Sequence, residues 1–193
     1  MKQVTWKLRC LSLPAVERYC KRCGTRTVFT CSGQFRVNAQ KKLLDIWLIY
    51  QCARCGTTWN AEILSRVSSR TLAAGQLEDF CCNSSVLAWR YAADWKLLRR
   101  LGAEPFLPEY VVEGEDFRPD EEVELEIKTD VPLPVRVSAL LRNKLGLPQK
   151  AFLELAALDR VVSIPRQDLK KCRLGGGIRI LFQTEPGDPA VIE

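Results

Sequence analysis

The 193-residue sequence contains no histidine, one methionine and no long apolar run. Without histidine, no imidazole can serve as a general base, a metal ligand or a charge switch near neutral pH. Any metal site must therefore use cysteine, aspartate or glutamate. The longest strongly apolar run, residues 46–50, is far shorter than the ~20 residues of a transmembrane helix. The first residues also lack the apolar stretch of a signal peptide, so we expect a soluble cytoplasmic protein with no membrane partner.

Charge is spread unevenly along the chain. Residues 1–102 carry 17 Lys and Arg against 6 Asp and Glu, whereas residues 103–130 carry 2 against 11. The acidic stretch also contains several prolines, which is the composition of a connector. We therefore predict a first module over residues 1–102, an acidic connector over 103–122 and a small second module over 123–193.

Hydrophobic periodicity predicts an α+β fold. In the first module, residues 34–38 and 45–50 alternate as strands of a hairpin that turns at 39–42. A helix is predicted from Asn60 to about Thr71, and a second one from residue 83 or 84 to Gly102. The second module is predicted as two helices with strands, namely a strand at 123–128, a helix ending at Gly146, a helix beginning at Pro148, a strand at 161–164, a glycine loop at 175–177 and a strand at 178–182.

Two Cys-x-x-Cys pairs, each followed by glycine, are the strongest signal in the sequence. The pairs are Cys20 with Cys23 and Cys52 with Cys55. Each tight turn can aim two sulfurs at one ion, and the intervening hairpin would bring the second pair beside the first. We predict one structural zinc ion on these four thiolates, which leave no open position for catalysis. A redox pair is disfavoured, because such a pair normally opens a helix in a βαβ unit and these pairs flank a hairpin. A four-cysteine iron centre is the alternative that spacing leaves open.

The other five cysteines have no ligand spacing, and their default role is packing in the core. A second metal site made from Cys10, Cys31, Cys81 and Cys82 is a weaker alternative. Adjacent residues on a helix point about 100° apart, so Cys81 and Cys82 are not expected to share one ion. We expect at least one of these two to be buried without metal. The fifth of these cysteines is Cys172.

With the hairpin and the cysteine pairs placed, the chain resembles domain-of-unknown-function family 1062, an uncharacterised bacterial family. The stretches that carry the resemblance are residues 20–23, 35–39, 45–50 and 52–60, supported by 90–92 and 168–174. The resemblance implies a zinc-ribbon start and brings no established activity.

The C-terminal part separately resembles the small RNA-binding module of small-subunit ribosomal protein four, which is two helices on a short sheet. Residues 136–141 match its first helix, and residues 147–150 match the start of its second. Glu154 and Asp159 stand where that module usually has basic residues. The resemblance therefore implies the fold together with an altered RNA surface.

Three classes of function compete: nucleic-acid binding (RNA more than DNA), protein interaction or scaffolding with a purely structural zinc, and catalysis. We expect no enzyme, because the sequence has no nucleophile elbow, phosphate-binding glycine motif or catalytic carboxylate motif. Single-stranded nucleic acid is bound by cations and stacking aromatics, for which Trp47 and Tyr50 are candidates. The predicted nucleic-acid contacts are Lys21, Arg22, Arg36, Lys41, Lys42, Arg54, Arg136 and Lys150.

Overall fold

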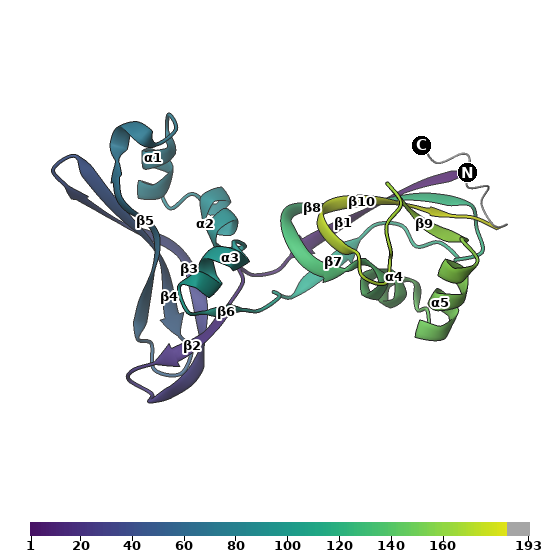
Figure 1. The fold of residues 1–193 in the computed structure, drawn as a ribbon, viewed down its shortest axis with the longest axis horizontal. Helices are drawn as coiled ribbons and strands as arrows, with labels where there is room; N and C mark the ends of the chain where they lie inside the picture. Colours follow the sequence, from purple (N-terminus) through teal and green to yellow (C-terminus); the bar gives the residue numbers. More distant parts are fainter. Residues whose placement is uncertain (185–193) are drawn as a thin grey trace. The chain divides into compact units, whose positions relative to one another are not determined.

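The computed structural model describes residues 1–184, which form two five-stranded sheets with helices packed against them (Figure 1). The chain divides into two compact units. One is Ser12–Pro108, which we call the cysteine unit; the other joins Met1–Leu11 to the chain from Glu109 onward, and we call it the split unit. In residues 1–184, no helix is both long enough and apolar enough to cross a membrane.

This division differs from the one predicted from charge, which ended the first module at residue 102. The first eleven residues belong with the C-terminal part because their strand pairs with strands that follow residue 109. The predicted connector over 103–122 is also structured, since it contributes a strand to each unit and the buried side chain of Phe117. The predicted boundaries differ because the charge composition of a segment does not indicate which strands it pairs with or which side chains it buries.

The cysteine unit is built on an antiparallel sheet with the strand order β5-β4-β3-β2-β6. Its central pair is the predicted hairpin, which is longer than predicted and turns at Lys41 and Lys42. On β4 the even-numbered side chains from Leu44 to Cys52 are buried, which is the period-two pattern of a half-covered strand. The strands are β2 (Val16–Cys20), β3 (Thr25–Gln40), β4 (Leu43–Cys52), β5 (Thr58–Ser68) and β6 (Glu104–Pro105).

The helix predicted from Asn60 to about Thr71 is wrong. Most of this stretch belongs to β5, which pairs antiparallel with β4 and is followed by the short 3-10 helix η1 (Ser69–Thr71). Locally, Asn60 suits a helix start, but buried Ala61 and Ile63 alternate with exposed neighbours. A period of two is typical of a strand with one buried face, and pairing with β4 overrides the local helix signal.

Three helices cover one face of this sheet. Phe80 and Leu87 pack on Ile46 of β4, and Leu98 joins the core around the cysteines. The single helix predicted from residue 83 to Gly102 is two helices, because Asp94 starts a new one by accepting a hydrogen bond from the Leu97 backbone N–H at 2.9 Å. The helices are α1 (Gln76–Cys81), α2 (Ser85–Ala92) and α3 (Trp95–Arg100).

The split unit has the strand order β7-β1-β8-β10-β9, with α4 and α5 as the predicted helix pair. Gly146 ends α4 in the left-handed conformation, as predicted, and β9 coincides with the predicted strand at 161–164. The predicted glycine loop at 175–177 instead lies inside β10, where it produces register shifts against β8. The elements are β1 (Lys2–Cys10), β7 (Tyr110–Glu113), β8 (Val123–Arg136), α4 (Val137–Leu145), α5 (Gln149–Ala157), β9 (Val161–Ile164) and β10 (Arg173–Phe182).

Gly114 follows β7 where only glycine fits. A Cβ there would lie 2.5 Å from the backbone oxygen of Thr5 and 2.5 Å from Cδ1 of Trp6, and its φ is 137°. We predict that Gly114→Ala destabilises the split unit by about 2–3 kcal/mol, as overpacking of a core does. Urea unfolding measures this change. Gly176→Ala is the control because its Cβ would meet nothing within 4 Å, and equal effects of the two changes would contradict the prediction.

Candidate metal centre and basic surface

The two predicted cysteine turns are built alike. In the first, the Gly24 N–H donates to the Cys20 carbonyl oxygen at 2.9 Å, and in the second the Gly56 N–H donates to the Cys52 carbonyl oxygen at 2.9 Å. Both glycines have positive φ, 67° and 71°, with open space around the missing Cβ. Glycine is therefore favoured there for backbone conformation and not for lack of room.

The four sulfurs form one cluster. All lie within 4.8 Å of one another, with 3.6 Å between the Sγ atoms of Cys20 and Cys55 and 3.9 Å between those of Cys23 and Cys52. A tetrahedron with Zn–S bonds of ~2.3 Å has sulfur–sulfur edges of about 3.8 Å. The cysteines therefore have the number, chemistry and spacing to hold one metal ion, as the sequence predicts for this set.

Hydroxyl groups beside the second turn favour its thiolates. Thr27 Oγ1 lies 3.2 Å from Cys52 Sγ, and Thr57 Oγ1 lies 3.1 Å from Cys55 Sγ. The Thr27 contact, aided by backbone N–H groups of the turn, lowers the pKa of Cys52 to about 6, and Thr57 lowers the pKa of Cys55. The contact with Cys55, followed by burial, raises the pKa of Cys23 to about 12. The cluster therefore contains preformed thiolate character, which metal binding requires.

The remaining cysteines are not part of this cluster. Cys172 is buried as expected, and Cys10 and Cys31 are half-buried. The expectation that Cys81 or Cys82 is buried is wrong, since both are exposed at the end of α1. A helix of six residues packs only one narrow face, and here Phe80 occupies it. Among the described residues, the metal-compatible cluster contains none of these five cysteines.

The predicted nucleic-acid contacts fall into three groups. Exposed Lys21, Arg22 and Arg54 lie on the two cysteine turns, at one end of the β3–β4 hairpin, and exposed Lys41 and Lys42 form its other end. A strand of the length of β3 spans roughly 50 Å, so these two groups are far apart. Arg36 lies between them on β3. The third group, Arg136 and Lys150, is exposed on the split unit.

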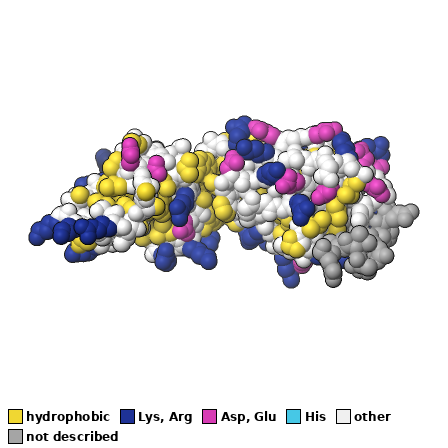
Figure 2. Space-filling model, turned by 90° about the horizontal axis from the view of Figure 1, so that it is seen from above, with side chains coloured by type: hydrophobic (Ala, Val, Ile, Leu, Met, Phe, Trp, Pro, Cys, Tyr) yellow, Lys and Arg dark blue, Asp and Glu magenta, His cyan; other side chains and the backbone are white. Residues whose placement is uncertain are grey.

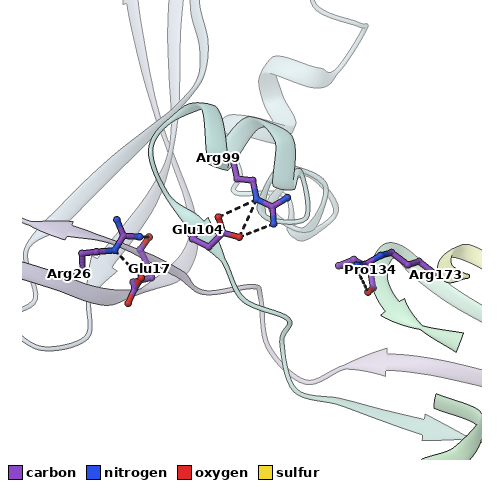
Figure 3. A network of polar contacts seen from close by, with 6 residues as sticks. All are labelled: Glu17, Arg26, Arg99, Glu104, Pro134 and Arg173. Atoms are coloured by element: carbon purple, nitrogen blue, oxygen red, sulfur yellow. Dashed lines mark hydrogen bonds and ion pairs between the residues drawn. The ribbon is translucent and has the colours of Figure 1, made fainter. Parts of the chain in front are cut away.

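Some cations of the cysteine unit are neutralised by ion pairs, whereas the predicted nucleic-acid contacts on this unit are not. Arg26 of β3 donates to Glu17 of β2 at 2.9 Å, and Arg99 of α3 donates to Glu104 of β6 at 2.8 Å (Figure 3). Over residues 1–184, no ion pair involves Lys41, Lys42 or the other predicted contacts on this unit. Their charge is free to act on a partner.

The two aromatic residues predicted to stack on bases, Trp47 and Tyr50, differ in how deeply they are buried. Tyr50 cannot stack on a base, because it is completely buried and packs against Trp59. Trp47 is half-buried, points away from the helix-covered face and carries the Arg36 guanidinium 5.8 Å from its ring centroid. Sequence reasoning missed Arg18, whose guanidinium lies 4.2 Å from the Trp59 ring centroid. These two residues are distant in the sequence, and no local pattern links them.

Arg66 of β5 was also missed. This residue lines a surface hollow together with Lys41 and Lys42 at the end of the hairpin. The wrong helix prediction hid this residue, because a helical reading gives no reason to place it beside the turn.

Fold and site define an α+β protein of two units, one of which carries a four-cysteine cluster. A family model described as "Protein of unknown function (DUF1062)" matches residues 37–167, which is more than half of the chain, and the chain belongs to this family. The predicted family resemblance is thereby confirmed.

The match includes Cys52 and Cys55 and begins after Cys20 and Cys23. The ribosomal-module resemblance of the C-terminal part stays a prediction. No curated protein and no solved structure matches the chain.

Proposed function

We propose that this is a nucleic-acid-associated binding protein, and not an enzyme, whose cysteine unit is a zinc ribbon. Structural zinc on Cys20, Cys23, Cys52 and Cys55 fixes one end of the β3–β4 hairpin, and cations at its other end contact phosphates. The carrying observation is the basic hairpin end formed by exposed Lys41 and Lys42, which make no ion pair with any residue from 1 to 184. Lys and Arg side chains gather over this end of the unit (Figure 2).

The sheet face beside these cations supports single-stranded nucleic acid as the ligand. Trp47 and Arg36 lie opposite each other on β4 and β3, on the face that the helices leave open. A half-buried tryptophan with an arginine over it offers a stacking platform next to a basic track, the combination that single strands use. The C-terminal resemblance favours RNA over DNA.

The test is a fluorescence-anisotropy titration of labelled single-stranded RNA at about 50 and 200 mM salt. Four phosphate contacts give a log–log slope of roughly −3 on single strands, so affinity should fall about 60-fold between these concentrations. No binding of RNA or single-stranded DNA at the lower salt would contradict the proposal.

Charge reversal locates the contact surface. We predict that Lys41→Glu with Lys42→Glu weakens RNA binding more than Arg136→Glu with Lys150→Glu, because exposed Glu154 on α5 already opposes an anion on the split unit. The same titration compares the two pairs, which carry equal changes of charge. A larger effect of the Arg136 and Lys150 pair would move the surface to the split unit.

A protein-interaction role is the second candidate, with zinc purely structural. It is favoured by exposed Tyr19 and Val28, which are diagonal neighbours on β2 and β3 and have 54% and 40% of their surface accessible. Failure of the RNA titration would make this the preferred function.

A further inference from the structure

We propose that Lys41, Lys42 and Arg66 form one phosphate-binding site that a β-bulge in β5 assembles. The inference deepens the proposed function, on which its ligand rests: a backbone phosphate of a single-stranded nucleic acid. Arg66 is the residue that neither the cysteine motif nor the hairpin signal indicated.

The three cations share one surface feature. They line a hollow of about 490 Å³ together with Gln40 and Leu43, and all three are exposed. Two ammonium groups from the β3–β4 turn and one guanidinium from β5 supply positive charge, and the guanidinium can hold two phosphate oxygens at once. An anion of phosphate size is the matching ligand.

The backbone is strained where these side chains are attached. Lys41 has φ of 57° and Arg66 has φ of 52°, in the left-handed region that glycine and asparagine prefer. A two-residue hairpin turn usually takes glycine or asparagine at such a position. Among the described residues, the other non-glycine residues with positive φ are Asn83 and Asp159, types that tolerate it. Lysine and arginine therefore occupy strained positions at one shared site, which is where functional residues are found.

Asp45 holds the bulge that places Arg66. The register shifts between Leu44 and Ile46 of β4, so that Ser65 and Arg66 oppose Asp45 alone. Oδ1 of Asp45 accepts a hydrogen bond from the Arg66 backbone N–H at 2.8 Å. Bulges re-aim side chains, and this one turns Arg66 toward the end of the hairpin.

The Asp45 carboxylate is engaged by backbone and leaves the Arg66 guanidinium unpaired within residues 1–184. Asp45 is therefore a positioning residue: it sets the direction of a cation without cancelling its charge.

Two variants of Asp45 distinguish the effect of the bulge on RNA binding from the effect of net charge. Asp45→Ala removes a negative charge beside a basic cluster, so charge alone predicts tighter RNA binding, whereas loss of the bulge predicts weaker binding. We expect Asp45→Ala to bind RNA about tenfold more weakly, because a misplaced Arg66 would lose about one charged hydrogen bond to the phosphate. Asp45→Asn keeps an oxygen that can accept from the Arg66 N–H, and we expect it to bind at least as tightly as the wild type.

Arg66→Gly tests the cation itself. Glycine suits a φ of 52°, so the melting temperature should hold or rise while RNA affinity falls about tenfold and the salt slope shrinks by about 0.7. A merely structural residue would not separate stability from affinity in this way. Lys170→Gly, at an exposed lysine of the split unit, is the control for removal of one cation and should leave affinity near the wild-type value.

A second probe keeps this inference apart from the proposed function. If the wild type binds RNA but Arg66→Gly and Asp45→Ala bind it equally well, the site is overturned and the nucleic-acid function stands. If the wild type binds no RNA, tripolyphosphate is titrated while backbone amide signals are followed by NMR. Shifts at Lys42 and Arg66 that disappear in Arg66→Gly would then support an anion site without the nucleic-acid function. No shift there would overturn both.

Discussion

The variant Cys20→Ser with Cys52→Ser is expected to lose its metal and to leave the cysteine unit unfolded while the split unit stays folded. One ligand is removed from each turn, so neither turn can hold the ion with its remaining sulfur. Zinc binding of this kind is coupled to folding and is worth ~10–16 kcal/mol in small zinc peptides. That is comparable to the whole free energy of unfolding of a typical domain, so the sheet from β2 to β6 should not survive the loss.

Elemental analysis and amide NMR measure this outcome. The wild type expressed without added metal should contain about one equivalent of zinc, and the variant none. Cys81→Ser with Cys82→Ser is the matched control, because both thiols are exposed and lie outside the four-sulfur cluster. Iron in the wild type, or a fully folded metal-free variant, would refute structural zinc.

Trp6→Ala is expected to destabilise the split unit by about 3–5 kcal/mol, the range for large aromatic deletions in cores. Trp6 is completely buried on β1, an inner strand of its sheet. Its ring centroid lies 5.5 Å from that of Phe117, and its Nε1 donates to the Glu115 carbonyl oxygen at 2.8 Å. The change removes packing and also leaves a carbonyl oxygen without its donor.

Thermal unfolding should show the transition of the split unit moved down by at least about 12 °C, with the transition of the cysteine unit unchanged. Thr5→Ala is the control on the same strand, since Thr5 points to the exposed face. A common shift of both transitions would mean that the two units unfold together, which would contradict the prediction.

Local signals predicted the features whose causes are local. The cysteine turns follow from two-residue spacing and a following glycine, and the hairpin follows from alternation on both sides of a polar turn. Gly146 ends α4 for the same kind of reason, because a left-handed residue is needed there.

Features set by distant partners were missed. Lys2 pairs with Val123, and nothing near either residue records that pairing. Residues 60–68 look helical alone and become a strand only because β4 offers an open edge. Arg66 reaches the hairpin end through a bulge, a backbone irregularity without a sequence pattern that we could read. The candidate metal ligands were therefore predictable, whereas the full set of cations at the hairpin end was not.

The position of β1 also sets an order for folding during synthesis. β1 leaves the ribosome before the cysteine unit, yet its partners β7 and β8 follow only after the whole of that unit, a delay of roughly 5–20 s at ordinary translation rates. Meanwhile the cysteine unit can fold, with the proposed metal ion bound, and its folding brings its own two ends together, since the Phe106 N–H donates to the Ala15 carbonyl oxygen at 2.8 Å. The folded cysteine unit shortens the flexible loop between β1 and its partner strands, which lowers the entropy cost of pairing them. If the proposed zinc binds there, its supply during translation should govern the yield of a unit that contains none of the four clustered cysteines.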